Sequence, residues 1–248
     1  MDTIYSRINE GRLVVDGGEF EDQELKSPRI DELVIANGAQ LANVRFHDVR
    51  IKHGSFGAGR AAVTYTGCQF ENCRLAITTV GRANFINCSF AGSYIKGWFA
   101  LSAEFLQCSF SSELKHVVFD ARPSPQVKLD LRRTKNRYEN NDFTASSFVD
   151  VSFRGGIELK REFLPKSPGG FFLPEARAAY SSMADKVRTL RDPWAVDLLA
   201  FLEVRLDACL EGQEQDYVSP ADIGRTTKSA DGQQVLQNLF TEVAEQLS

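Results

Sequence analysis

The side chains best suited to chemistry in this 248-residue chain are its five cysteines and three histidines. A zinc site typically uses closely spaced thiolates, as in C-x2-C. Four of the cysteines, Cys68, Cys73, Cys88 and Cys108, are instead separated by 5, 15 and 20 residues. Because these separations are multiples of five, we interpret the four cysteines as small packing residues of a repeat, and we predict no metal site.

The histidines and glycines do not complete a catalytic or cofactor motif. His47, His53 and His116 lie outside any nucleophile motif such as G-x-S-x-G. The stretch Gly57-Ala58-Gly59 lacks the residues that follow in a dinucleotide-binding loop. We therefore predict no catalytic residues and no cofactor, and we expect a protein that is not an enzyme.

A five-residue repeat organises most of the chain. Helices need a period near 3.6 and strands a period of 2, so a sustained period of five indicates neither alone. Cys88 and Cys108 are 20 residues apart, as are Phe90 and Phe110. Four five-residue sides thus make one coil, and equal side chains stack in columns. The large positions of the repeat, of which Ala100 is the weak member, are Tyr65, Phe70, Leu75, Val80, Phe85, Phe90, Ile95, Ala100, Phe105 and Phe110.

Segments such as Cys68-Gln69-Phe70-Glu71-Asn72 and Ala83-Asn84-Phe85-Ile86-Asn87 resemble the pentapeptide-repeat family, and the resemblance covers residues 12–155. It implies a right-handed parallel β-helix, roughly square in section, with the central Phe and Leu pointing inward. We therefore predict a mainly β fold, a pentapeptide-repeat solenoid followed by a C-terminal α-helical region. Burying each Phe or Leu contributes about 1.5–3 kcal/mol, and such a close-packed core leaves no interior cavity for a substrate.

The repeat and its interruptions divide the chain into three parts. Residues 1–155 form the β-helix, with Leu13, Val14, Val15 and Phe20 capping its first coil. Residues 156–173 form a linker rich in proline and glycine. Residues 174–248 hold three helices, over 175–191, 192–211 and 232–247; Asp192-Pro193 is expected to be the N-cap and first-turn proline of the second. These helices cap the solenoid or form a homodimer interface through Trp194, Leu198, Phe201, Leu202, Leu236 and Phe240.

The repeat fails over residues 120–140, where two prolines and a polar run predict a loop or an elongated coil. This stretch is basic. Loops that project from a rigid scaffold often carry function, so it is either a partner-contact loop or only a solvated excursion. Its candidate contact residues are Arg122, Lys128, Arg132, Arg133, Lys135 and Arg137.

Charge is distributed unevenly along the chain. Residues 1–39 hold 4 basic and 9 acidic side chains, net −5; residues 40–155 hold 15 and 9, net +6; residues 156–248 hold 10 and 15, net −5. The best-known pentapeptide-repeat proteins protect DNA gyrase by imitating DNA. Such a mimic needs a dense negative surface, because duplex DNA carries one charge per about 1.7 Å. The basic middle of the rod does not meet this requirement.

The function that we expect is a non-enzymatic rod that docks on a protein and inhibits, neutralises or protects it, as an immunity protein does with a toxin. One alternative is a gyrase- or topoisomerase-binding DNA mimic of the fluoroquinolone-resistance type. A second is a nucleic-acid-binding or carbohydrate-active β-helix. Nucleic acid is not the expected partner, since the aromatic residues are committed to the core. The start of the chain resembles no signal peptide and no apolar run suits a membrane, so we expect no membrane partner and a cytoplasmic location.

Overall fold

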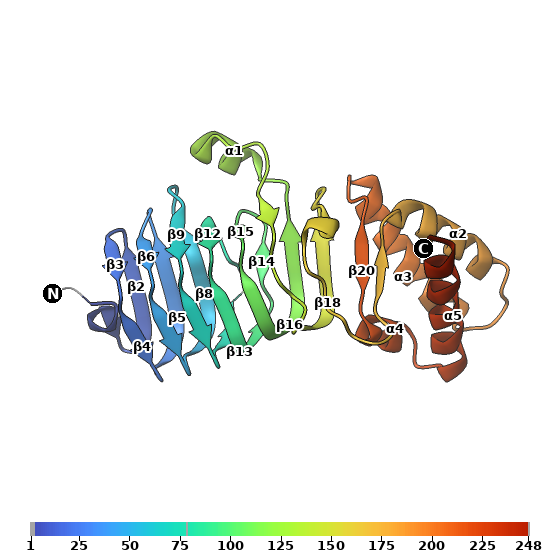
Figure 1. Ribbon diagram of the computed structural model, residues 1–248, viewed down its shortest axis with the longest axis horizontal. Helices are drawn as coiled ribbons and strands as arrows, with labels where there is room; N and C mark the ends of the chain where they lie inside the picture. Colours follow the sequence, from blue (N-terminus) through green and yellow to red (C-terminus); the bar gives the residue numbers. More distant parts are fainter. Residues whose placement is uncertain (1–2, 78, 248) are drawn as a thin grey trace.

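The computed structural model describes residues 3–77 and 79–247, and it confirms the predicted β-solenoid with a C-terminal helical region. About five coils stack along the long axis of the molecule (Figure 1). Most strands pair in parallel with those of neighbouring coils. The ten large positions of the five-residue repeat are buried, each no more than 2% exposed, so the inward direction predicted for them is correct.

Within the described residues, two sheets form the sides of the solenoid. The smaller sheet contains β3 (Glu19–Glu21), β6 (Gln40–Ala42), β9 (Val63–Thr66), β12 (Ala83–Ile86), β15 (Glu104–Leu106) and β17 (Tyr138–Glu139). The larger sheet contains β1 (Ile8–Asn9), β2 (Arg12–Asp16), β4 (Glu24–Lys26), β5 (Arg29–Ala36), β7 (Arg45–His47), β8 (Arg50–Ala58), β10 (Gln69–Glu71), β11 (Arg74–Ala76), β13 (Ser89–Lys96), β14 (Phe99–Ala100), β16 (Ser109–Asp120) and β18 (Ser147–Arg154). Because β13 pairs with both β10 and β11, the long strands run over two sides of a coil.

Aromatic rings stack face to face inside the solenoid. Ring centroids are 4.7 Å apart between Phe46 and Phe70, between Phe70 and Phe90, and between Phe90 and Phe110. Phe143 continues this column, 4.6 Å from Phe110. The spacing matches the separation of about 4.8 Å between paired strands. Each ring therefore lies on the ring of the neighbouring coil, and the column fixes the register of the coils.

On two sides of the coil, the polar or thiol side chain two positions before the central residue also makes a specific contact. Ser93 Oγ donates to the carbonyl of Phe70 at 2.9 Å, and Cys88 Sγ donates to the carbonyl of Tyr65 at 3.5 Å, one coil earlier in each case. A buried carbonyl thus obtains the hydrogen-bond partner that it needs. The contact repeats in two columns, one made by Cys68, Cys88, Cys108 and Asn141 and the other by Cys73, Ser93, Ser112 and Ser146.

The outward amide side chains of the repeat have a backbone role. Asn43, Asn72 and Asn87 each turn a corner of the coil with a φ of 53°. This left-handed conformation is disfavoured for most residues but is tolerated by Asn. The corner Asn residues are therefore explained by the geometry of the coil, and they are no evidence for a binding surface.

The first coil is covered by residues other than those predicted. Leu13 and Val15 point inward from β2, which pairs in parallel with β5, so they belong to the first coil itself. Val14 alternates with them and points outward, 37% exposed. The cover is Ile4, which is 2% exposed and precedes a 3-10 turn over Tyr5–Arg7. The prediction failed because Leu13, Val14 and Val15 lie on a strand and so alternate between the two faces.

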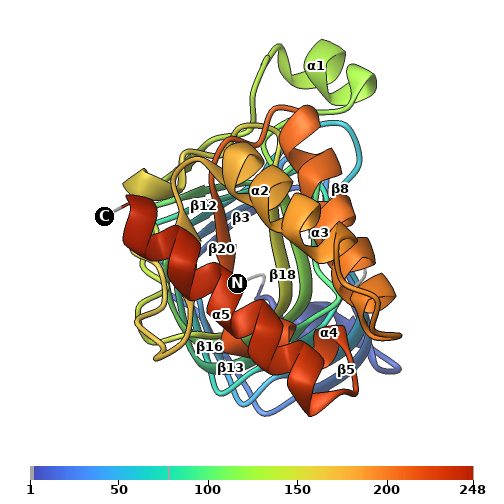
Figure 2. The same cartoon turned by 90° about the vertical axis from the view of Figure 1, so that its right-hand side faces the viewer.

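The excursion over residues 120–140 is partly helical, which corrects the prediction of a loop or elongated coil. It contains α1 (Pro125–Leu131), which projects from the side of the solenoid (Figures 1 and 2). Ser124 is the N-cap, its side chain accepting from the amide of Val127 at 3.3 Å, and Pro125 stands at the first helical position. The two prolines and the polar run predict a loop, but Ser124-Pro125 is also typical of a helix start, and here it begins α1.

Most of the predicted linker, 156–173, belongs to the folded parts on either side. Ile157 and Leu159 are buried in the solenoid core, with a 3-10 turn over Leu159–Arg161. The amide of Phe143 donates to the carbonyl of Phe163 at 2.7 Å, so residues up to 163 complete the last coil. At the other end β19 (Phe171–Leu173) pairs with β20 (Asp216–Val218) in an antiparallel sheet. These contacts leave 164–170 as the connection.

The C-terminal region has four described helices, one more than predicted. They are α2 (Ala176–Arg188), α3 (Ala195–Leu210), α4 (Pro220–Thr226) and α5 (Ala230–Leu247). They cluster at one end of the solenoid (Figure 1), the end that faces the viewer in Figure 2. α3 starts later than predicted, because Asp192 and Pro193 form a preceding turn in which the Asp192 carbonyl accepts from the Ala195 amide at 3.0 Å. No helix in the described part of the chain is long and apolar enough to cross a membrane.

Candidate functional site

Side chains from the segment between α3 and α5 close the last coil of the solenoid. Gln213 Oε1 accepts from the amides of Gly156 and Ile157, at 3.1 and 3.0 Å. Gln215 Oε1 accepts from the amide of Lys160 at 3.1 Å. In earlier coils such amides donate to the carbonyls of a neighbouring coil. The two glutamines therefore satisfy the donors that the absence of a further coil leaves open.

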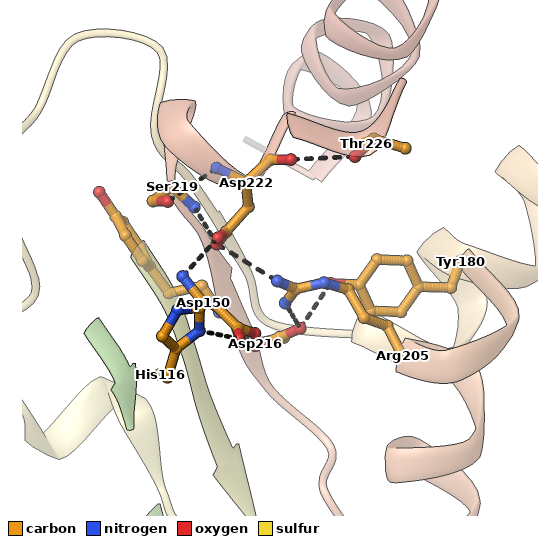
Figure 3. Close-up of polar contacts among 9 residues, drawn as sticks. His116, Asp150, Tyr180, Arg205, Asp216, Ser219, Asp222 and Thr226 are labelled. Atoms are coloured by element: carbon orange, nitrogen blue, oxygen red, sulfur yellow. Dashed lines mark hydrogen bonds and ion pairs between the residues drawn. The ribbon is translucent and has the colours of Figure 1, made fainter. Parts of the chain in front are cut away.

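Tyr217 and Asp222 complete this closure. The ring of Tyr217 packs edge-on against Phe148, with centroids 5.7 Å apart, and belongs to the solenoid core. Asp222 Oδ1 accepts from the amide of Asp150 on β18 at 2.8 Å (Figure 3). The cap is thus built mainly from residues 213–222, a stretch to which the sequence analysis gave no role.

A buried ion-pair network holds the cap against the helices. Arg205 of α3 donates from Nη1 to Asp216 Oδ2 at 2.6 Å and from Nη2 to Asp222 Oδ2 at 3.3 Å (Figure 3). The hydroxyl of Tyr180 donates to the same Asp216 oxygen at 2.6 Å. Burial acts to lower the pKa of Arg205, but the negative charges of Asp216 and Asp222 outweigh it and raise the pKa. The guanidinium is therefore a permanent cation that joins α3, β20 and α4.

A groove of about 670 Å³ lies between the last coils of the solenoid and α3. One wall is formed by β16 and β18, including Val118 and Phe153, and the other by Phe201 and Val204 of α3. Val204 is 68% exposed, and Phe99 at the edge of the groove is 45% exposed. The volume lies within the range of small-molecule pockets. We call this feature the junction groove.

The titratable groups of the junction groove do not form an activated nucleophile. His116 and Asp150 line the groove, and His116 Nδ1 lies 2.6 Å from Asp150 Oδ2 (Figure 3). Cys209 also lines it, but burial raises the pKa of this thiol to about 11. A thiol with that pKa is protonated at neutral pH, and the thiolate is the reactive form. Burial likewise raises the pKa of Cys73 in the repeat to about 11, which suits its role as a hydrogen-bond donor.

The described side chains were also compared with the geometry that a metal site needs. No cluster of three or more His, Cys, Asp or Glu side chains there is arranged to hold a metal ion.

Four of the six predicted partner-contact residues are used in contacts within the chain. Arg122 pairs with Asp120 and with Glu211 of the helical region, at 3.0 and 2.9 Å. Lys135 Nζ donates to the carbonyl of Gly156 at 2.7 Å. Both side chains therefore link the excursion to the last coil and the cap.

Arg133 and Arg137 fix the excursion to the smaller sheet. Arg133 Nη1 and Arg137 Nε lie 3.5 and 3.6 Å from Glu104 Oε1, and Glu104 is buried. Arg133 also donates to the carbonyl of Ser102. Of the predicted set, Lys128 and Arg132 remain exposed without an ion pair among the described residues. These contacts hold the basic excursion against the solenoid and the helical region.

The six residues assigned to a cap or dimer interface divide into two groups. Leu198, Leu202, Leu236 and Phe240 are 0% exposed and form the core of the helical region. They are not available to a second copy of the chain. Trp194 and Phe201 are partly exposed, and Phe201 lines the junction groove. The amphipathic pattern identified the core of the helices correctly, but it does not describe an outer interface.

One flat side of the solenoid carries ordered cations that the sequence analysis did not single out. Arg29, Arg50 and Arg74 lie side by side in register on β5, β8 and β11. Lys96 of β13 and Lys115 of β16 pair in a second row. We call the side formed by Arg29, Arg50, Lys52, Arg74, Lys96 and Lys115 the cationic face. The sequence does contain a signal for this face. Each of the six cations is adjacent in sequence to the central residue of its five-residue side, and these central residues are Ile30, Ile51, Leu75, Ile95 and Leu114.

The charges of the cationic face are largely unpaired. Lys52 Nζ lies 2.6 Å from Asp31 Oδ1, and Arg29 Nε lies 3.8 Å from the same oxygen. The guanidinium of Arg74 lies over the ring of Tyr94, 5.3 Å from its centroid. Within the described residues, no acidic side chain forms an ion pair with Arg50, Arg74, Lys96 or Lys115. β5, β8, β11, β13 and β16 pair in this order, and Figure 1 shows β5, β8, β13 and β16 following one another along the rod, so these charges are held on a continuous backbone frame.

No protein-family model matches this chain, and no curated protein matches it. The arrangement of the β-solenoid, its cap and the cationic face is therefore interpreted from the chain itself.

Proposed function

We propose that this chain is a non-enzymatic rod that binds a partner protein, such as a toxin or an enzyme, and inhibits, neutralises or protects it. The observation that carries the proposal is the cationic face. Its cations sit on paired strands whose register is fixed by stacked aromatic rings. A surface that is already ordered loses little conformational entropy on binding. Rigid flat faces of this kind suit docking to another folded surface.

We further propose that the solenoid is of the pentapeptide-repeat kind. The inward Phe columns, the small residue two positions earlier and the left-handed corner Asn support this proposal. The gyrase-binding alternative within that family draws no support from the cationic face, since a DNA mimic needs the opposite charge. A gyrase supercoiling assay with micromolar protein distinguishes this alternative from the rod that binds a toxin or another enzyme. An effect on supercoiling would favour the DNA-mimic function.

Affinity capture tests the proposed function. The tagged full-length chain is incubated with nuclease-treated native lysate of the source cells, and bound proteins are quantified by mass spectrometry. We expect a protein recovered in near-stoichiometric amount with the wild-type chain and not with the tag alone. Recovery of no stoichiometric protein would contradict a protein-binding function.

A further inference from the structure

We propose that the cationic face binds an acidic patch on a folded protein. This inference rests on the proposed function and adds the place of contact and the chemistry of the partner. Arg29, Arg50 and Arg74 stand directly opposite one another on neighbouring strands. Like charges in such positions destabilise a sheet. Asp31 offsets this repulsion at Arg29 and Lys52, but no acidic side chain among the described residues does so at Arg50 or Arg74, and an acidic partner would remove the remaining electrostatic cost.

The extent of the cationic face favours a compact acidic patch over a long polyanion. From Arg29 on β5 to Lys115 on β16 it covers five strands, which span about 19 Å at a strand separation of about 4.8 Å. Carboxylates stand toward the two ends, Asp31 on β5 and Glu113 on β16. Beyond them, residues 1–28 hold 3 basic and 7 acidic side chains, net −4, and the last 93 residues of the chain have a net charge of −5. A nucleic acid longer than the face would run onto these acidic ends.

The aromatic side chain on this face is not open for base stacking. Tyr94 stands between Arg74 and Glu113 in the same row. The guanidinium of Arg74 already covers its ring. Proteins that bind single-stranded nucleic acid usually offer open aromatic rings beside their cations. Acidic protein side chains, by contrast, need only the guanidinium and ammonium groups that this face presents.

A charge-reversal variant and a matched control test the inference. The face variant is Arg50→Glu, Arg74→Glu, Lys96→Glu, and all three positions are exposed. The control reverses three exposed cations of the helical region, Arg177→Glu, Arg191→Glu and Lys228→Glu, and so changes the net charge equally. A third variant with Gln at the three face positions removes the charge without introducing carboxylates. Circular dichroism shows whether each variant folds. If the Glu variant does not fold, the Gln variant replaces it in the binding measurements.

The capture experiment is repeated with these chains, and the recovered partner is then purified and titrated. We expect the face variant to bind it roughly tenfold or more weakly, mainly through slower association. The control should bind within about twofold of the wild type, and rising salt should weaken wild-type binding far more than binding of the face variant. Equal recovery of the same protein by face variant and wild type would overturn the inference while leaving the proposed function intact. Recovery of nothing by any chain would reject both.

Duplex DNA serves as the probe for the other class of polyanion. Fluorescence anisotropy with a labelled 20-base-pair duplex is expected to give a Kd weaker than about 10⁻⁴ M at physiological salt, the weak end of non-specific binding. Tighter binding that the face variant abolishes and the control retains would overturn the choice of an acidic protein.

Discussion

Arg205→Met tests whether the ion-pair network between α3, β20 and α4 holds the cap in place. The side chain of Arg205 is 14% exposed, and those of Asp216 and Asp222 are 10% and 7% exposed. Removing the cation leaves two buried carboxylates without a positive partner. Met retains the length and apolar character of the stem, so the change isolates the loss of charge.

The expected loss in the free energy of unfolding is about 3–5 kcal/mol, as for other buried pairs from which one partner is removed. The lower end is more appropriate here, because Tyr180 and the amide of Asp150 still donate to the two carboxylates. Arg188→Met is the matched control. Arg188 also pairs with two carboxylates, those of Asp185 and Glu203, but its side chain is 48% exposed. Its removal should cost less than about 1 kcal/mol.

Urea unfolding measures the difference. Trp98 lies in the solenoid core and Trp194 in the helical region, so fluorescence in a Trp98→Phe background follows the helical region alone. This separation matters because the two parts need not unfold together. Arg205→Lys should lose less than Arg205→Met, since it keeps the charge but not the planar fork that reaches both carboxylates. If Arg205→Met lost no more stability than Arg188→Met, the network would not be what holds the cap.

Three further predictions concern the solenoid. Burial raises the pKa of Glu162 to about 7, well above the usual value for a glutamate, so the folded state binds the proton more tightly. Stability should therefore fall by about 3 kcal/mol as the pH rises from about 4.5 to 7, and Glu162→Gln should flatten this dependence in urea titrations. Ser93→Ala removes both a donor to a carbonyl and the acceptor for the amide of Cys73, so it should cost about 1–3 kcal/mol, whereas Ser89→Ala, on the outward face of the same coil, should be nearly neutral. Phe90→Ala should cost about 3–5 kcal/mol in thermal or urea unfolding, because it interrupts a stacked column; a smaller loss would mean that the coils collapse around the gap.

The sequence predicts the solenoid well because its signal is periodic. Phe70 and Phe90 occupy the same place in each coil, and a single rule of burial applies to every member of the column. The amphipathic pattern of the last helix likewise identifies Leu236 and Phe240 as core residues. These features depend on side-chain spacing alone, which is visible without knowledge of the fold.

The cap and the cationic face depend on relations between distant segments. Gln213 replaces a neighbouring coil by accepting from two amides 57 and 56 residues away, and its local sequence gives no sign of this role. Arg133 looks like a free cation in a polar run, yet it binds groups 31 and 49 residues away. Counting charge by segment shows a basic middle but does not separate Arg133 from Arg50. Only the register of the coils makes that distinction.

The side-chain closure of the last coil also determines that the rod has a finite length. An open solenoid end presents a row of unpaired donors and acceptors, together with an apolar core, to the opposite end of another molecule. Such a head-to-tail contact does not close on itself and leads to filaments. Gln213, Gln215 and Asp222 accept from four backbone amides of the last coil through their side chains, which offer no continuing strand, and Ile4 covers the core at the other end. These closed ends therefore oppose end-to-end growth of the solenoid, although its repeat could in principle continue indefinitely.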